Sequence, residues 1–312
     1  MAKRYLSAAI TLFVLVFLSK NIYEHWQDLA GIKLTLGGWG LLAIATLIIL
    51  SAHCWAGYLW WQTLKFLQQN LPLREILPLY LKTNVAKYVP GNIWHYYGRI
   101  SAITNQGGTM TVATISVLLE PLMMAAAALI IVLLNLPKDF WGLALLGLGI
   151  TLGWLHPLAL NYSLQSLQKL KQRFQQKNSQ KLQQDSQQNL SPEIPLIKTY
   201  PTFLLLGEIG FLQLRFLGFC LVLGAIAPFP TEDLQTLFSA FSLAWVAGLV
   251  IPVPSGLGVF ESVMLVLLES HLSSAIILTV VGLLRLVSII AELIGAGLGS
   301  FPVPRRSKFR NH

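Results

Sequence analysis

The stretch MTVATISVLLEPLMMAAAALIIVLLNL, residues 110–136, contains a single ionisable side chain, Glu120. An apolar run of about 18 or more residues is long enough to cross the hydrocarbon core of a bilayer as an α-helix. The whole chain has the same character, because 54% of its 312 residues are hydrophobic and only 11% are charged. Soluble domains carry about 25% charged residues. The sequence therefore predicts an all-α integral membrane protein.

Eight apolar segments are found by working outward from this run. They cover residues 5–22, 37–64, 110–136, 140–162, 200–227, 234–253, 257–268 and 272–298. We interpret the first as an uncleaved anchor, since no small-residue cleavage pattern follows it. The seventh would form a helix only about 18 Å long, so we expect it to be tilted or half-inserted. The predicted fold is a polytopic helix bundle of about eight transmembrane segments, with re-entrant or broken helices at two Pro-Gly motifs.

The cations of the loops orient the chain. Lysines and arginines gather in residues 65–109, 163–199 and 305–312, and such loops normally face the cytoplasm. We expect both termini to be cytoplasmic. We divide this single membrane domain, 1–312, into a first half (1–162), a Gln- and Lys-rich cytoplasmic linker that is helical at its start (163–198), a second half (199–304) and a basic tail (305–312).

The charges, cysteines and histidines argue against nucleic-acid-binding, disulfide-rich and metal-binding proteins. The net charge of +9 is accounted for by the topology, so we expect no nucleic-acid partner. The two cysteines, Cys54 and Cys220, both lie inside apolar runs, so we predict neither a disulfide framework nor a zinc site. The histidines have no metal-binding spacing and no catalytic motif is present. We therefore expect no metal, cofactor or catalytic residue.

The first unusual stretch is KYVPGNIWHYYGR, residues 87–99, here called the first motif. Residues 73–88, which overlap its first two positions, have the apolar spacing of an amphipathic helix. Proline and glycine then stop that helix, asparagine can cap a new one, and a helix N-terminus attracts anions. We expect a lipid-headgroup site formed by Lys82, Lys87, Pro90, Gly91, Asn92, Trp94 and Arg99. The alternative is an aromatic belt at the interface with cations that only set topology.

The counterpart in the second half is IPVPSGLGVFE, residues 251–261, here called the second motif. Pro252 and Pro254 should end one helix and Ser255 should cap the next. Gly256 and Gly258 permit close approach of another backbone or a ligand. Paired breaks in the two halves of a membrane protein are typical of a transporter's binding site.

Ionisable side chains inside the apolar segments are costly and are functional candidates. Together with Pro254, Ser255, Gly256 and Gly258 of the second motif, we assign them to a polar path. They are Glu120, Glu208, Arg215, Glu261, Arg285 and Glu292. Those seven residues apart on one helix are too distant to pair, so we expect partners from other helices. Two interpretations stay open: pairing that fixes the bundle, or a path for headgroups or protons.

The order of these features resembles the lysylphosphatidylglycerol synthase transmembrane family. The first motif, a Gly-bearing turn at residues 106–108, Glu120 in the next span and PVPSGLGVFES follow one another as in that family. The resemblance implies a polytopic bundle with re-entrant elements and a lipid-translocating role. The positions that match are Lys87, Pro90, Gly91, Arg99, Glu120, Pro254, Gly256, Gly258 and Glu261. Pro121 stands where relatives often have arginine, and no soluble synthase domain follows Pro304, so we do not expect aminoacylation of lipid.

We therefore expect a lipid flippase or transporter that moves an anionic or glycosylated (polyprenyl-) lipid between the leaflets of a prokaryotic inner membrane. The expected partners are membrane lipids, either an anionic phospholipid or a polyprenyl-phosphate-linked lipid. A homo-oligomer or a separate lipid-modifying enzyme stays open as a protein partner. The alternatives are a lipid-linked transferase with Glu120 or Glu261 as its base, or a non-catalytic membrane subunit. The lack of a catalytic motif favours a role that is not enzymatic.

Overall fold

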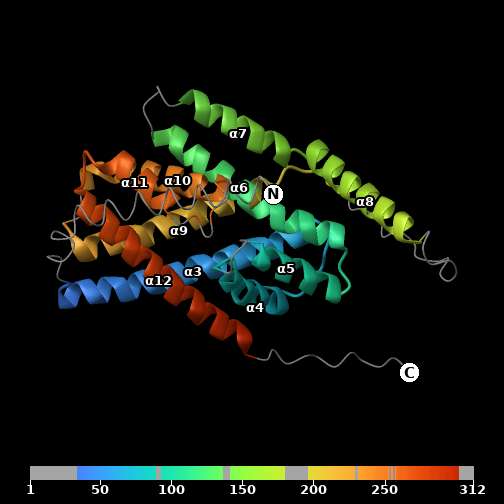
Figure 1. The fold of residues 1–312 in the computed structure, drawn as a ribbon, viewed down its shortest axis with the longest axis horizontal. Coiled ribbons are helices and arrows are strands. Elements are labelled where there is room, and N and C mark those ends of the chain that lie inside the picture. The colour runs from blue at the N-terminus through green and yellow to red at the C-terminus, as the bar shows by residue number, and fades with distance from the viewer. Residues whose placement is uncertain are drawn as a thin grey trace.

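The computed structural model describes residues 34–88, 93–135, 141–179, 196–228, 231–251 and 258–301, together with Val253 and Gly256. Within these ranges every regular element is helical, as the composition predicts (Figure 1). The predicted anchor at 5–22 and the basic tail lie outside the described residues, as does 180–195 of the linker.

Four helices are long and apolar enough to cross a membrane. They are α3 (Leu36–Phe66), α6 (Met110–Asn135), α9 (Thr202–Ile226) and α12 (Ser274–Ser300). Helices α7 (Trp141–Leu155) and α8 (Pro157–Ser179) are bent by 63° and form a fifth candidate span if they are counted together. The protein is thus a multi-pass integral membrane protein.

The structure qualifies the prediction of about eight spans. Segments 234–253 and 257–268 form α10 (Leu234–Val250) and α11 (Val259–Leu268), which are apolar but shorter than a full span. Helix α10 ends just before Pro252, a residue type that interrupts helical hydrogen bonding. The short seventh segment predicted from the sequence is confirmed. The described residues therefore contain four or five candidate spans, with two shorter apolar helices between α9 and α12.

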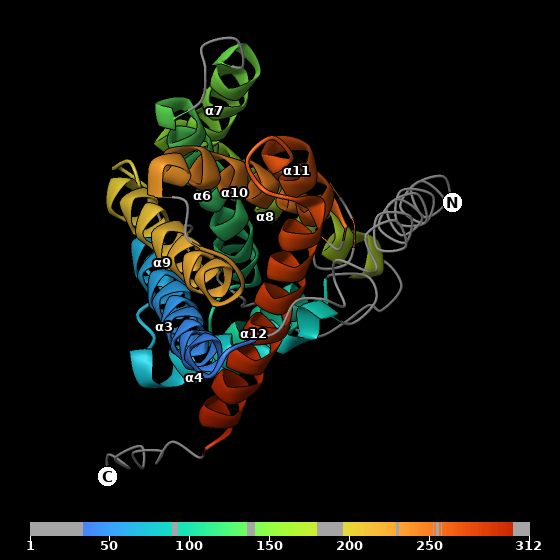
Figure 2. The same ribbon diagram turned by 90° about the vertical axis from the view of Figure 1, so that its left-hand side faces the viewer.

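The helices pack in pairs that are distant in sequence. Helix α3 lies along α9, α10 packs on α6, and α12 crosses α3 and contacts α4 (Leu73–Asn84) (Figures 1 and 2). Two glycines of α9 allow the approach to α3: a Cβ at Gly207 would lie 2.3 Å from Leu59, and one at Gly218 would lie 2.7 Å from Ile49. Small residues at helix contacts are typical of membrane bundles, where close packing replaces the hydrophobic effect.

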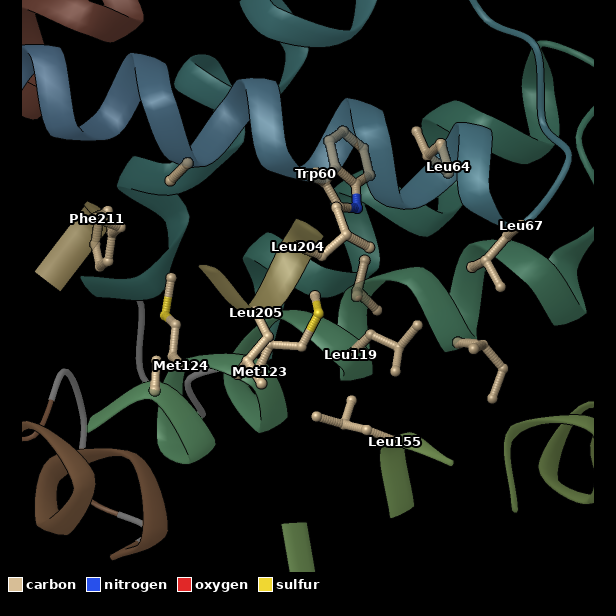
Figure 3. Close-up of a cluster of buried hydrophobic side chains, with 14 of the residues drawn as sticks. Trp60, Leu64, Leu67, Leu119, Met123, Met124, Leu155, Leu204, Leu205 and Phe211 are labelled. Carbon is tan, nitrogen blue, oxygen red and sulfur yellow. The ribbon is translucent and has the colours of Figure 1, made fainter. Parts of the chain in front are cut away.

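A large apolar cluster joins the two halves of the chain. Trp60 of α3, Met123 of α6, Leu155 of α7 and Leu204 of α9 all belong to it, and each is almost fully buried (Figure 3). The indole nitrogen of Trp60 donates to Ser116 Oγ at 3.3 Å, so the polar atom of this buried side chain has a hydrogen-bond partner. The cluster fixes α3, α6 and α9 relative to one another and holds the charged side chains that they carry.

The first motif follows a helix that the periodicity predicted. Residues 73–88 form α4 and a 3-10 turn, η1 (Val85–Tyr88), and Trp94–Asn105 form α5. Ile76 and Tyr80 are buried on the inner face of α4. Helix α8 runs across the predicted linker boundary at residue 163, in agreement with the expected helical start of the linker. A second 3-10 turn, η3 (Thr231–Asp233), precedes α10.

Candidate functional site

A buried ion pair joins α5 to the span α6. Arg99 Nη1 donates to Glu120 Oε2 at 2.6 Å, and Arg99 is only 1% exposed. The Tyr80 hydroxyl donates to the other Glu120 oxygen at 2.5 Å, and the guanidinium lies 3.9 Å from the centre of the Tyr80 ring. Burial, with the Glu120 charge adding to it, raises the pKa of Tyr80 well above its ordinary value, so the phenol keeps its proton and acts as a donor. Arg99 and Glu120, which the sequence assigned to two different sites, thus form one.

A second buried cluster connects η1 with the spans α3 and α12. Lys87 Nζ donates to Glu292 Oε1 at 2.5 Å, and His53 Nε2 lies 3.2 Å from the same oxygen. The Asn84 side chain contacts His53 Nδ1 at 3.4 Å. Glu292 is 3% exposed, whereas the Lys87 side chain keeps a quarter of its surface exposed. Lys87 therefore places its ammonium on a membrane-buried carboxylate while remaining partly accessible.

His95 is buried on α5, one turn before Arg99. Burial lowers the pKa of His95 to about 3, and the charges of Arg99 and Lys87 act in the same direction. The ring is therefore neutral at physiological pH and adds no further charge. Tyr80 of the first cluster and Asn84 of the second lie one turn apart on α4, so the two clusters are neighbours.

A third cluster holds the second motif. Glu261 on α11 forms an ion pair with Arg285 of α12, and Arg285 Nη2 also donates to the Gly256 carbonyl at 3.2 Å. Glu261 Oε2 accepts from the Gly258 amide at 2.7 Å. Gly256 and Gly258 have φ values of +63° and +79°, a region that favours glycine. A Cβ at Gly256 would lie 3.2 Å from Gly248 Cα, so the backbone of the second motif closely approaches α10.

The start of α11 corrects the predicted cap. The helix begins at Val259 with Gly258 at its N-cap, not after Ser255. The Glu261 carboxylate satisfies the Gly258 N–H instead of a serine hydroxyl. A G-x-x-E spacing resembles the second half of a capping box, and this signal in the sequence could have located the helix start.

Two further charged residues lie on α9. Arg215 Nη2 donates to Ser288 Oγ of α12 at 3.1 Å, and its guanidinium lies 5.2 Å from the centre of the Trp245 ring. Glu208, two turns earlier, is 1% exposed, and its Oε2 has no hydrogen-bond partner in the described part of the chain. As the sequence argument expected, the paired ionisable residues of the spans take their partners from other elements.

The remaining predicted residues are less central. Lys82 is exposed on α4, and Trp94 is 49% exposed at the start of α5. Pro90, Gly91, Asn92, Pro254 and Ser255 lie outside the described residues. The N-cap position of α5 is Ile93, and its side chain makes no capping hydrogen bond.

Sequence reasoning missed the neutral members of these clusters. They are Tyr80, Asn84, Ser288 and Trp245, and His53 was interpreted only as a packing residue. Ser288 could have been found from the sequence. Ser288 and Glu292 follow Arg285 by three and seven residues, which places all three on one face of α12. In the described ranges no group of three or more His, Cys, Asp or Glu side chains could hold a metal ion.

Comparison with known proteins adds one finding. Residues 4–295 match the family model described as the lysylphosphatidylglycerol synthase TM region. No curated protein matches the chain significantly.

Proposed function

Because the chain belongs to the lysylphosphatidylglycerol synthase transmembrane family, we propose that it moves an anionic or glycosylated lipid between the leaflets of a prokaryotic inner membrane. The cargo would be an anionic phospholipid or a polyprenyl-phosphate-linked lipid. Its headgroup would follow the buried polar side chains, while its acyl chains stay in the bilayer. The family is named for the membrane region of a lipid-modifying synthase, which supports a lipid as the cargo.

The observation that carries this proposal is the polar face of α12. Arg285, Ser288 and Glu292 lie on one side of this candidate span, over about 10 Å of helix. Each contacts a different element: Arg285 the second motif, Ser288 the span α9, and Glu292 both α3 and the Lys87 side chain. Charged residues inside spans are expensive and typically mark a transport path.

This arrangement gives a headgroup successive partners. Exposed Lys82 and Trp94 would receive it at the cytoplasmic interface, and partly exposed Lys87 would then contact it first among the buried clusters. Arg99 lies deeper and is already bound to Glu120, so it would contact a headgroup only by exchanging partners. The ion pair between Arg285 and Glu261 would offer the next exchange, beside the second motif.

The test is lipid movement in proteoliposomes. We expect the purified protein to accelerate exchange of fluorescent phosphatidylglycerol between leaflets, measured by chemical bleaching of the outer leaflet. Empty liposomes and liposomes with an unrelated multi-pass protein serve as controls. Exchange no faster than in the controls, with phosphatidylglycerol and with a polyprenyl phosphate alike, would contradict the proposal. Product formation from a labelled lipid donor by the protein alone would instead favour the transferase.

A further inference from the structure

The middle of α9 carries a guanidinium whose hydrogen-bonding capacity is largely unused. Arg215 is one residue from the midpoint of this candidate span and is 7% exposed. Only its Nη2 is bonded, to the neutral Ser288 hydroxyl, and its Nε and Nη1 have no partner among the described residues. Arg99 and Arg285, by contrast, each bind a carboxylate.

A second unpartnered donor lies beside it. The indole Nε1 of Trp245 on α10 is buried and has no hydrogen-bond partner in the described structure, and an indole nitrogen can only donate. The Arg215 guanidinium packs over the Trp245 ring at 5.2 Å. Three nitrogen donors and one positive charge thus gather where α9, α10 and α12 meet.

No carboxylate of the described residues forms a hydrogen bond or ion pair with Arg215. Glu292 uses its Oε1 for Lys87 and lies near His53, and its Oε2 makes no hydrogen bond to Arg215 or to any other described residue. Glu208 lies seven residues earlier on α9, about 10 Å along the helix. A buried charge and buried donors without partners are both unfavourable. The region is therefore suited to a ligand with one negative charge and several acceptor oxygens.

We propose that Arg215 and Trp245 form a binding site for the phosphate of a lipid headgroup at mid-membrane depth. A phosphodiester carries one negative charge and oxygens that can accept from both side chains, and arginine suits phosphate through its planar set of donors. A lipid is the source that fits a site at the centre of a candidate span, because it delivers the phosphate from within the bilayer. The choice of a lipid as the ligand rests on the proposed function. The inference adds that the headgroup of this lipid bears a phosphate.

The experiment measures binding rather than movement, so that the two proposals can fail separately. The full chain in detergent is titrated with phosphatidylglycerol, with diacylglycerol of the same acyl chains, and with glycerol phosphate. The variants are Arg215→Gln and Trp245→Phe. The second replaces the indole by a smaller aromatic ring and removes the N–H donor. Arg74→Gln, at an exposed arginine of α4, is the matched control.

We expect phosphatidylglycerol to bind more tightly than diacylglycerol. Arg215→Gln should weaken phosphatidylglycerol binding by about tenfold or more and Trp245→Phe by about threefold, while diacylglycerol binding and the Arg74→Gln variant stay unchanged. The ratio of the two lipid affinities separates a lost site from a folding defect, which would lower both. If Arg215→Gln does not fold, the ratio in Trp245→Phe decides alone.

Each other outcome overturns one proposal. An unchanged affinity ratio in the foldable variants overturns the phosphate site and leaves lipid movement standing. Glycerol phosphate that binds as tightly as the lipid, with the same dependence on Arg215, overturns the lipid source in favour of a soluble anion. If the protein moves no lipid but still selects the headgroup in a way that depends on Arg215, the phosphate site stands and the proposed function is overturned.

Discussion

Replacing Arg99 by glutamine should destabilise the fold strongly. The substitution removes the 2.6 Å bond to Glu120 Oε2 and leaves that carboxylate buried with the Tyr80 hydroxyl as its remaining bonded partner. Breaking a buried ion pair by removing one partner costs about 3 to 5 kcal/mol. Within that loss, the stacking of the guanidinium over the Tyr80 ring at 3.9 Å accounts for about 0.5 to 2 kcal/mol. Because Arg99 is 1% exposed, solvent screening reduces these values little.

Equilibrium unfolding in mixed detergent micelles, followed by far-ultraviolet circular dichroism, measures the effect. We expect a loss of about 3 to 5 kcal/mol for Arg99→Gln. The exposed control Arg74→Gln should change stability by less than about 0.5 kcal/mol. The double variant with Glu120→Gln should lose less than the sum of the single variants by about 1 kcal/mol or more, since it leaves no unpaired charge.

Two results would refute this reasoning. If Arg99→Gln is no more destabilising than Arg74→Gln, the ion pair contributes little to the fold. If the effects of Arg99→Gln and Glu120→Gln simply add, the two side chains do not interact as the structure has them. An Arg99→Gln protein of normal stability that binds anionic lipid poorly would instead favour the headgroup site expected from the sequence.

Gly256→Val should abolish lipid movement in proteoliposomes without preventing membrane insertion, because its φ is +63° and a Cβ would meet Gly248 Cα at 3.2 Å; full activity would mean that the second motif is only a turn. Lys87→Gln should slow movement of anionic lipid by about tenfold, since it removes a cation bound to the α12 carboxylate. The exposed control Lys198→Gln should leave the rate unchanged. Equal effects of the two variants would mean that both lysines only set the membrane topology. In inverted vesicles, a Gln183→Cys protein without its native cysteines should react with an impermeant thiol reagent; reaction in intact cells would reverse the predicted orientation.

The helices were predictable because their signals are local. Length and apolar composition located α3, α6, α9 and α12 to within a few residues, and periodicity located the amphipathic helix that became α4 and η1. Even the shortness of α11 followed from the distance between the second motif and the next polar turn.

The pairings inside the site were not predictable, because they depend on which helices meet. Lys87 and Glu292 are 205 residues apart, and no spacing rule connects them. The sequence analysis assigned Arg99 to a headgroup site, because its burial against α6 cannot be recognised from the sequence. Helix α4 contacts α12 and α5 contacts α6, and these contacts bring such distant side chains together.

The order in which the helices are synthesised bears on how the charges of α12 enter the membrane. A charged residue at the centre of a helix costs about 2.5 to 3.5 kcal/mol during translocon-mediated insertion, and α12 carries Arg285 and Glu292. It is the last helix of the described chain. When it leaves the ribosome, Glu261, Lys87 and His53 have already been synthesised, so both charges can meet their partners as the helix enters.

Helix α9 has no such advantage. Its Arg215 finds its bonded partner in Ser288, which is synthesised 73 residues later. For that interval the nascent chain holds a charged arginine at the centre of a candidate span before α12 exists. Inserting α9 should therefore cost more than inserting α12, and a chain truncated before α12 should leave α9 poorly inserted.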